Sequence, residues 1–445
     1  MKKQIAFCLA FIASLSVFGQ AQQEIVLNKT YQNLALDKSN VIKYSLKLDK
    51  GGIYQFSILQ QGIAVYYNLT DNLNNQVFES NTPEDIDGYE KFEYKPIKSQ
   101  TFTLTVKRFE NSENTDSGKV TIVVTSLNKT EIVLREKIKA DLETENKKNV
   151  QTIDIDHFWE AYDNLKNCRT FADSTNSFQK LYLDRATEGL IDFIQVRDFT
   201  AEKYVRLAAK YPKFYSTIRK NTYQTKKSEA IIDSVFFKFK QLYPNFKPFK
   251  VCFAMGILNT GGTISNNFVL IGTEITTSTS DVDLSEFDGN EFSKNLAGKD
   301  DIVQKIKGII AHECVHTQQK RPADTGFIKC ELLYKVMREG FCDFIGELVS
   351  GNKLGGNHEY GDKNEKQIWT DLKNELCNQN IGNWLYNYST VKEKPADLGY
   401  YVGYKIAQEY YKNASDKNQA IVDIIEMTDP IKFLELSRYD QKPKQ

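Results

Sequence analysis

The residues best suited to chemistry are two histidines that stand four positions apart in the chain, His312 and His316. They enclose Glu313 in the segment HECVH, and four histidines occur in the whole chain. Residues i and i+4 of a helix lie on one face, so the two imidazoles can bind one metal ion. A glutamate after the first histidine is placed to take a proton from a metal-activated water. The spacing predicts a zinc site with Glu313 as catalytic base; the alternative is two core histidines with ordinary hydrogen bonds.

A zinc site of this kind needs a third protein ligand and leaves one position for water. The segment REGFCDF supplies a candidate on a second predicted helix, whose inward face is marked by residues at helical spacing: Leu332, Val336, Glu339 and Asp343. Carboxylates on an inward face are costly unless they coordinate or accept hydrogen bonds. We expect Glu339 to bind the metal and Asp343 to accept the outer N–H of a ligating histidine. The alternative for Glu339 is a surface ion pair with a neighbouring basic residue.

Three other residues are possible ligands. His358 lies in a segment rich in Gly and Asn, with no motif around it. Cys314 and Cys342 stand next to predicted ligands, but helical spacing puts both on other faces. We therefore expect one zinc ion per chain, held by the two histidines of HECVH and by Glu339.

The two motifs also carry a resemblance. HECVH followed by REGFCDF resembles the gluzincin metallopeptidases, whose second motif supplies a glutamate ligand. Five stretches are similar to a bacterial family of predicted zinc-dependent proteases: DHFWEAYD, LNTGGTISNNFVLIGTE, IIAHECVHTQQ, REGFCDFIGELVSG and DLGYYVGYKIAQEYY. The resemblance runs from about Ile153 to Tyr439. It implies zinc ligands at His312, His316 and Glu339, with Glu313 as the base.

Peptide hydrolysis also needs a donor for the developing oxyanion. Tyr400 and Tyr404 lie one helical turn apart in LGYYVGYK, and gluzincins often place such a tyrosine downstream of the glutamate ligand. We favour Tyr404 over Tyr400. Either tyrosine can instead be an ordinary packed aromatic, because 24 tyrosines are spread through the chain.

A peptide substrate commonly binds by extending a sheet edge. The turn-rich segment NTGGTIS precedes a predicted strand at Phe268, and its Gly261, Gly262 and Thr263 are candidates to border that edge. A plain hairpin turn is the alternative. The chain lacks the Gly-x-Met-Glu-Asn segment with which one aminopeptidase branch holds a free amine, so we expect an endopeptidase.

The elements that position this site follow a leader and a strand-rich region. Lys2, Lys3 and the apolar run from Ile5 to Phe18 predict a signal peptide over residues 1–21, and hence export to the periplasm or the outside of a bacterial cell. No later segment predicts a transmembrane helix. Residues 22–128 alternate apolar and polar side chains, which predicts an antiparallel β-sandwich. The stretch KYSLKLDKGGIYQFSI resembles the pre-peptidase C-terminal domain. A binding role and a purely stabilising role are both open for this domain.

In the remainder of the chain, apolar residues recur at the longer spacing of helices. Residues 129–150 form a charged connector or helix, and residues 151–440 predict a mainly helical α+β zinc-peptidase domain with a small sheet. The predicted fold is therefore multidomain, with a β-sandwich ahead of this domain. Six cysteines follow the leader and allow 15 pairings, with buried free thiols as the alternative.

Composition narrows the possible functions. Fifty-eight basic residues balance 58 acidic ones, which argues against a nucleic-acid-binding protein. We expect an exported zinc metallopeptidase that acts on a peptide or protein substrate, with an oligomeric state that the sequence leaves open. The alternatives are a non-catalytic binding or assembly protein of the cell envelope on a peptidase scaffold, and a zinc amidase acting on a non-peptide amide.

Overall fold

The computed structural model of the chain describes residues 23–80, 86–110, 115–287, 289, 291–298, 301–320, 330–355, 357–388, 390–391 and 394–441. The chain divides into two compact units, Met1–Lys137 and Ile138–Gln445. The predicted signal peptide, residues 1–21, lies outside the described residues.

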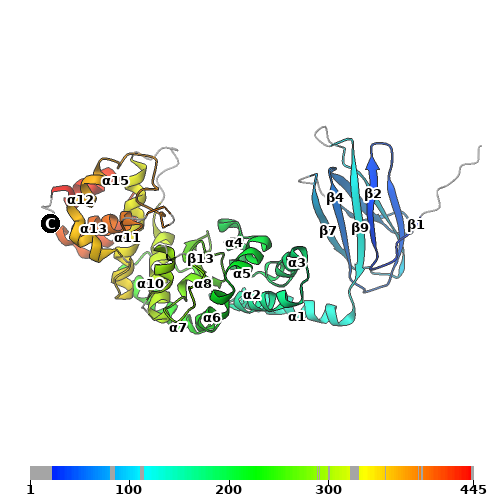
Figure 1. Ribbon diagram of the computed structural model, residues 1–445, viewed down its shortest axis with the longest axis horizontal. Coiled ribbons are helices and arrows are strands. Elements are labelled where there is room, and N and C mark those ends of the chain that lie inside the picture. The colour runs from blue at the N-terminus through cyan, green and yellow to red at the C-terminus, as the bar shows by residue number, and fades with distance from the viewer. Residues whose placement is uncertain are drawn as a thin grey trace, which may run out of the picture. The chain divides into compact units, whose positions relative to one another are not determined.

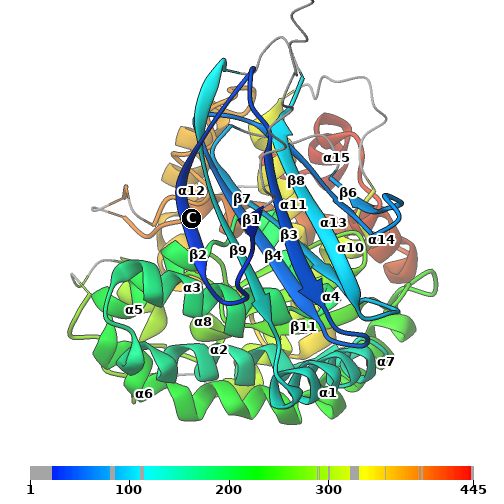
Figure 2. The ribbon, with the colours of Figure 1, turned by 90° about the vertical axis from the view of Figure 1, so that its right-hand side faces the viewer.

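The N-terminal unit is built of strands (Figures 1 and 2). They are β1 (Gln23–Glu24), β2 (Thr30–Asp37), β3 (Ile42–Leu48), β4 (Tyr54–Gln61), β5 (Val65–Thr70), β6 (Gln76–Glu79), β7 (Gly88–Tyr94), β8 (Gln100–Arg108) and β9 (Ser117–Ser126). One sheet has the order β1-β3-β8-β5-β6 and the other the order β2-β9-β4-β7.

Alternating side chains explain these two sheets. In β4 every second residue from Tyr54 is buried, and β8 buries Phe102, Leu104 and Val106 in the same way. The buried faces form one hydrophobic core. All strand pairs of the unit are antiparallel except the two-residue β1, which pairs with β3 in parallel. The predicted strand-rich region ahead of a helical one is confirmed.

The predicted connector, residues 129–150, contains helix α1 (Lys129–Glu145) and the first residue of strand β10 (Val150–Gln151). The division between the two units falls within α1. Glu145, at the end of α1, is buried and accepts hydrogen bonds from the backbone N–H groups of Thr152 and Ile153. These bonds fix the end of the helix to the C-terminal unit.

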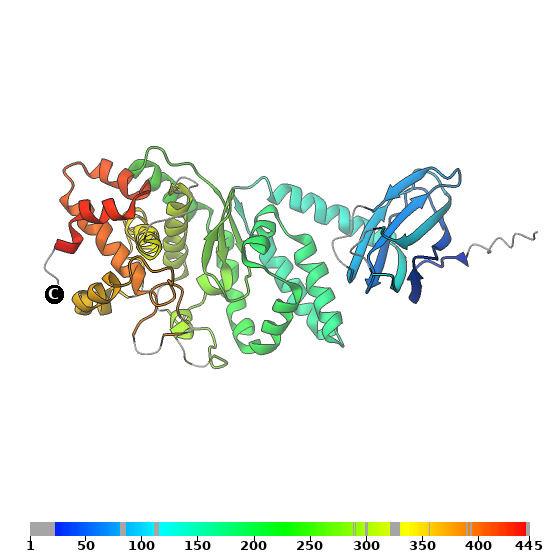
Figure 3. The same cartoon turned by 90° about the horizontal axis from the view of Figure 1, so that it is seen from above.

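The C-terminal unit is mainly helical (Figure 3). Its α-helices are α2 (Ile153–Asn164), α3 (Phe171–Leu181), α4 (Glu188–Arg197), α5 (Ala201–Lys210), α6 (Pro212–Thr222), α7 (Glu229–Leu242), α8 (Thr273–Thr276), α9 (Glu291–Leu296), α10 (Ile302–Gln318), α11 (Glu331–Ser350), α12 (His358–Lys373), α13 (Leu398–Asn413), α14 (Lys417–Ile425) and α15 (Pro430–Ser437). Short 3₁₀ helices are η1 (Leu165–Asn167), η2 (Leu183–Arg185), η3 (Tyr223–Lys227) and η4 (Tyr439–Gln441). One hydrophobic core runs through the unit.

A small sheet crosses this unit in the order β10-β11-β13-β12, with β11 (Lys250–Ala254), β12 (Gly262–Ile264) and β13 (Phe268–Gly272). Strands β10, β11 and β13 are parallel, and β12 is antiparallel at one edge. Gly262 begins the edge strand, so the hairpin-turn alternative for NTGGTIS does not hold at this residue. A strand of three residues, Gly-Thr-Ile, is too short to show an alternation of apolar and polar side chains.

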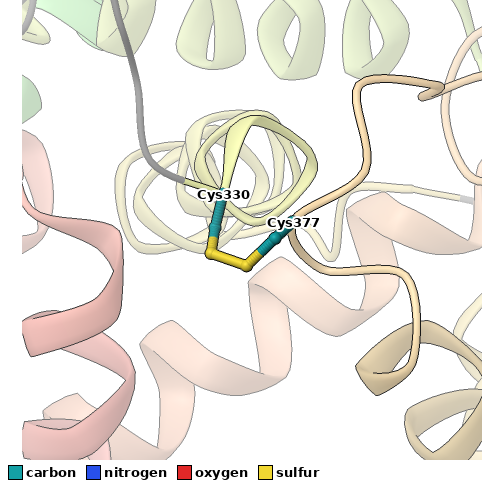
Figure 4. Close-up of a disulfide and its surroundings, with 2 residues drawn as sticks. All are labelled: Cys330 and Cys377. Carbon is teal, nitrogen blue, oxygen red and sulfur yellow. A yellow bond between two sulfur atoms is a disulfide. The ribbon is translucent and has the colours of Figure 1, made fainter.

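One disulfide joins Cys330, at the start of α11, to Cys377, in the segment after α12 (Figure 4). The backbone N–H of Leu333 donates to the carbonyl of Leu376 beside it, at 3.1 Å. The other cysteines of the described chain are free thiols: Cys168, Cys252, Cys314 and Cys342. In the part of the chain that is described, no helix is both long and apolar enough to cross a membrane.

Candidate metal centre

The site is built on two adjacent helices, α10 and α11. Asp301 caps α10 by accepting a hydrogen bond from the backbone N–H of Gln304, so the helix is set from its first turn. His312 and His316 follow one turn apart on α10, while Glu339 and Asp343 lie one turn apart on α11. All but His316 are buried, and His316 is half-buried. These are the four residues that helical spacing predicts for a metal and its support.

A third helix, α13, touches the backbone of α11 directly. A Cβ atom on Gly340 would lie 2.2 Å from the backbone nitrogen of Tyr404, and one on Gly403 would lie 2.0 Å from the carbonyl oxygen of Val336. The two glycines let the helices approach more closely than any side chain allows. This contact fixes how α13 packs against α11, the helix that carries Glu339 and Asp343.

Donor atoms of two histidines and one carboxylate converge. Nε2 of His316 lies 3.2 Å from Oε2 of Glu339, and Nε2 of His312 lies 3.6 Å from the same oxygen. Two ligands that each bind zinc at ~2.0–2.1 Å with a tetrahedral angle lie roughly 3.3 Å apart. The observed separations fit that value, so the three side chains can hold a zinc ion.

The outer nitrogens of both histidines have partners. Nδ1 of His312 lies 2.8 Å from Oδ1 of Asp343, and Nδ1 of His316 lies 2.9 Å from Oε1 of Gln319. Gln319 in turn donates to the carbonyl of Arg338 at 2.8 Å. An acceptor at Nδ1 favours the tautomer with its proton on Nδ1, which leaves Nε2 of each ring as a ligand atom. Asp343 thus occupies the position expected of it, while Gln319 was not predicted.

The charged groups around Glu339 also favour its assignment as a metal ligand. Burial raises the pKa of this carboxyl, but His316 and His312 outweigh burial and hold the pKa well below its ordinary value. Glu339 is therefore ionised, as a metal ligand must be.

Cys342 gives a rival set of three groups, together with His312 and His316, whose potential donor atoms lie within 4.8 Å of one another. This buried cluster is compatible with zinc. Sγ of Cys342, however, contacts Nδ1 of His316 at 3.3 Å, whereas Glu339 faces Nε2 of that ring. Burial also raises the pKa of the Cys342 thiol well above its ordinary value, which disfavours the thiolate that binds zinc. The glutamate set is therefore the better of the two.

Glu313 lies between the histidines and the edge strand. The side chain is buried, and burial raises the pKa of its carboxyl above the ordinary value. A Cβ atom on Gly262 of β12 would lie 2.6 Å from Oε1 of Glu313. A carboxylate with a raised pKa, placed beside both histidines and the last strand that the described chain contributes to this sheet, is suited to general base chemistry on a bound peptide.

The three predicted edge residues have different neighbours. Gly262 faces Glu313, while Thr263 pairs with Leu270 of β13 within the sheet. Gly261 accepts a hydrogen bond from the backbone N–H of Gly272 at 3.0 Å and so closes the end of the hairpin. Of the three, Gly262 is the one in contact with a predicted catalytic group.

The structure places the two predicted tyrosines, Tyr404 and Tyr400, in different surroundings. The hydroxyl of Tyr404 donates to Glu347 at 2.8 Å, and its ring lies 4.5 Å from that of His358. The ring of Tyr400 instead stacks against His312 with centroids 6.2 Å apart. The two tyrosines share a face of α13 and differ by one turn along it, so Tyr400 lies at the level of His312 and Tyr404 at the level of Glu347. His358 bonds the carbonyl of Leu354 through Nε2 at 2.7 Å and does not join the ligand group.

Sequence reasoning missed Tyr386. Its hydroxyl donates to Oε1 of Glu339 at 2.6 Å, and its ring lies 6.3 Å from that of Tyr400. The backbone of Tyr386 is left-handed, with φ of 56°, which is uncommon for a bulky residue. Tyr386 lies in the segment between α12 and α13, and no local pattern there points to Glu339.

Residues 293–428 match the model of a family described as "Predicted Zn-dependent protease (DUF2268)". The match contains α10, α11 and α13 and is shorter than the resemblance seen in the sequence, which starts near Ile153. A search of curated proteins finds no match.

Two solved structures are similar to part of the chain. One is the pre-peptidase C-terminal domain of a collagenase from Bacillus anthracis, with 18% identity, a TM-score of 0.19, and coverage of 24% of this chain and 95% of that chain. The other is PliG of Aeromonas hydrophila, a periplasmic inhibitor of g-type lysozyme, with 13% identity, a TM-score of 0.20, and coverage of 24% and 96%. Likeness at these scores carries no inference about activity.

Proposed function

We propose that this chain is a zinc-dependent metallopeptidase that acts as an endopeptidase. The observation that carries the proposal is the convergence of Nε2 of His312 and Nε2 of His316 on Oε2 of Glu339, with Glu313 beside them. The family match over α10 and α11 supports the same reading. One zinc ion per chain would be held by these three side chains.

Each group then has a role. A bound zinc ion supplies a Lewis acid that polarises the scissile carbonyl and lowers the pKa of the attacking water. Glu313 takes the proton of that water and passes it to the leaving amine. Asp343 holds the orientation of His312, and Tyr386 holds the second oxygen of Glu339. Tyr400, against His312, is the better placed of the two predicted tyrosines to donate to the oxyanion.

The substrate would bind at the edge of the small sheet. Strand β12 is the last strand of its sheet in the described chain, so one side of its backbone is available for another strand. An extended peptide paired with β12 would pass Gly262, and so would bring a peptide bond to Glu313. A strand edge can receive the middle of a peptide, which favours endopeptidase action.

Export is part of the proposal. The disulfide between Cys330 and Cys377 supports it, because such bonds persist in oxidising compartments. The periplasm and the cell exterior of a bacterium both meet this requirement. Secretion of an epitope-tagged chain, followed by fractionation of cells and medium, tests the location.

Substitution of the base tests the activity. Glu313→Gln keeps the shape of the side chain but cannot accept the proton, so we expect peptide cleavage to fall by at least ~10³-fold while zinc content stays at one per chain. Glu331→Gln is the matched control, because Glu331 pairs with Lys335 on the same unit and touches no site residue. Cleavage by Glu313→Gln at the rate of the parent chain would overturn the proposal, as would a zinc-loaded parent that cleaves no member of a peptide library.

A further inference from the structure

Tyr386 is an exposed aromatic residue with buried neighbours. Its exposed fraction is 59%, whereas those of Trp384, Leu385 and Asn387 are 3% or less. Its backbone is left-handed, a conformation that is costly for a bulky residue and persists only where the surroundings hold it. Burial of the ring does not offset this cost, because most of the residue is exposed. Backbone strain of this kind collects at functional sites, which indicates a role for the exposed ring.

Asn387 and Asp397 hold the backbone of Tyr386 in place. The backbone N–H of Asn387 donates to Oδ1 of Asp397 at 3.2 Å, and the backbone N–H of Asp397 donates to Oδ1 of Asn387 at 2.8 Å. The carboxylate of Asp397 also accepts a hydrogen bond from the backbone N–H of Tyr386. Before Tyr386, the carbonyl of Trp384 accepts from the backbone N–H of Gly399 at 2.9 Å. The chain on both sides of Tyr386 is therefore fixed to the start of α13.

The hydroxyl end of Tyr386 is fixed to the metal centre. It donates to Oε1 of Glu339 at 2.6 Å. The ring of Tyr400, which is half-buried, lies 6.3 Å from that of Tyr386 and is nearly perpendicular to it. The ring of Tyr400 in turn lies 6.2 Å from that of His312. The two tyrosine rings thus lead from a proposed zinc ligand to solvent.

We propose that the ring of Tyr386 selects substrates with a large apolar side chain, such as Leu or Phe, next to the scissile bond. In the proposed function the scissile carbonyl meets the zinc ion at the position that the three ligands leave open. The substrate residues on either side of this bond then lie beside the ligands, and the ring bonded to Glu339 offers them an apolar face. Contact with that face removes apolar surface of both partners from water. Because the ring is held at both ends, it loses little rotamer freedom when the substrate binds.

The inference rests on the proposed peptidase function, since it names the substrate class of the same centre. It assigns two tasks to one residue: the hydroxyl supports Glu339, and the ring contacts the substrate. A single exposed aromatic residue on a surface needs no function. Tyr386 differs from such a residue in its left-handed backbone and in its bond to a proposed metal ligand. Tyr360 of α12 is 36% exposed with a helical backbone, and it serves as the matched control.

Two variants separate the tasks of Tyr386. Tyr386→Phe removes the hydroxyl and keeps the ring, whereas Tyr386→Asn removes both. Asn tolerates a left-handed backbone, so the path of the chain is kept. Peptide pairs with blocked ends carry Phe or Ala on one side of a bond that the parent cleaves, and a second set of pairs varies the other side. The kcat/KM of each peptide is measured at saturating zinc for the parent, both variants and Tyr360→Asn. The ratio within a pair does not depend on the fraction of the chain that holds zinc.

We expect the parent to cleave the Phe peptide of at least one pair ~10-fold or more faster than its Ala partner. Tyr386→Phe and Tyr360→Asn should keep this ratio, and Tyr386→Asn should bring it close to one. Zinc affinity should group the variants differently, because Tyr386→Phe and Tyr386→Asn both lack the hydroxyl that donates to Glu339 and should lose affinity alike. Melting temperatures show that each variant is folded, and Tyr386→Ala replaces Tyr386→Asn if that variant is not.

Three results would overturn the inference. A parent without preference for Phe over Ala in any pair has no such subsite. A ratio that falls equally in Tyr386→Phe and Tyr386→Asn assigns the preference to the hydroxyl and its metal ligand. A ratio that stays unchanged in Tyr386→Asn assigns it to other residues. All three leave the peptidase function intact, whereas a zinc-loaded parent that cleaves no peptide overturns that function and the subsite with it.

Discussion

At the scale of single residues, Gly262 packs against Glu313 with no room for a side chain of its own. An added Cβ atom would stand 2.6 Å from Oε1 of Glu313, too near for any real contact. The carboxylate must therefore move if any side chain is placed at residue 262. A substitution at residue 262 therefore tests whether activity depends on the position of the Glu313 carboxylate.

We predict that Gly262→Ala lowers kcat by about 100-fold, because a displacement of the base by ~1 Å is enough for such a loss. Zinc content should not change, since Gly262 touches no ligand. Gly261→Ala is the control, as its nearest neighbour is the end of the Ile275 side chain at 3.3 Å. Steady-state kinetics of the two variants make the comparison. Equal activity of Gly262→Ala and the parent would place the base elsewhere.

A second residue-scale prediction concerns Tyr386. Removing its hydroxyl in Tyr386→Phe leaves Oε1 of Glu339 without its donor, and loss of such an outer partner typically weakens metal binding by ~10–100-fold. Competition with a chelator of known affinity measures this effect. Tyr404→Phe should bind zinc like the parent chain, because its hydroxyl bonds to Glu347. Indistinguishable zinc affinities for Tyr386→Phe and Tyr404→Phe would contradict this role of Tyr386.

Sequence reasoning found the site residues that helical spacing brings together. It missed those whose position depends on tertiary packing. His312 and His316 are brought together by helical period alone, and Glu339 and Asp343 by the inward face of the next helix. Tyr386 depends on the path of a loop, which no local pattern encodes. Which of Tyr400 and Tyr404 lies beside His312 depends on where α13 packs along its neighbours, and the close approach at Gly340 and Gly403 is a tertiary contact that no local pattern shows.

At the scale of elements, α11 carries Glu339 and Asp343, and its first turn is tied down by the disulfide. Cys330 and Cys377 close a loop with a sequence separation of 47 residues (Figure 4). A cross-link stabilises chiefly by restricting the unfolded chain. The sequence left 15 pairings open, because spacing alone does not show which cysteines meet in space.

We predict that Cys330→Ser combined with Cys377→Ser lowers the free energy of unfolding by about 4 kcal/mol, from the length of the closed loop. Denaturant titration of the double variant and the parent measures the difference. Cys168→Ser is the control, since Cys168 is a free thiol. A loss below about 1 kcal/mol, or an equal loss in Cys168→Ser, would show that the bond does not stabilise the fold.

The elements were predictable where burial leaves a repeating pattern. Alternation in β4 and β8 and helical spacing in α10 and α11 are long enough to show it. Strands β10 and β12 have two and three residues, so neither shows a period, and β12 is nevertheless the edge that faces the base. The small sheet was therefore predicted without β12 as a strand, although Gly261, Gly262 and Thr263 were named as candidates to border a substrate edge.

At the scale of the whole molecule, the C-terminal unit buries several carboxyl groups that the site does not use, among them Glu274 and Asp154. Burial raises the pKa of Glu274 to about 7, although the backbone N–H groups of Gly256 and Leu258 donate to it. Burial likewise raises the pKa of Asp154 to about 7, against hydrogen bonds from Thr187. Glu274 holds the segment that leads into β12, so its ionisation affects the stability of the fold near the cleft.

The raised pKa of Glu274 determines whether stability rises or falls with pH. Between the unfolded value of 4.5 and the folded value of about 7, the folded chain holds the Glu274 proton and the unfolded chain does not. Stability from this group is therefore greatest at low pH and is lost as pH rises through that window, by ~1.4 kcal/mol per pH unit.

We predict that the difference in unfolding free energy between the parent and Glu274→Gln changes by about 3 kcal/mol from pH 4.5 to pH 7, with the parent losing stability relative to the variant. Denaturant titrations at several pH values measure it. Other titrating groups cancel in the difference, which is why the variant is needed. A difference that stays constant across this window would contradict a raised pKa for Glu274.

The central claim is that His312, His316 and Glu339 hold one zinc ion. X-ray absorption at the zinc edge of the zinc-loaded chain tests it most directly. The claim predicts a first shell of nitrogen and oxygen at ~2.0–2.1 Å with no sulfur, unchanged in Cys342→Ser and lost with the zinc itself in Glu339→Ala. A sulfur neighbour at ~2.3 Å that disappears in Cys342→Ser would contradict it and would make Cys342 the third ligand.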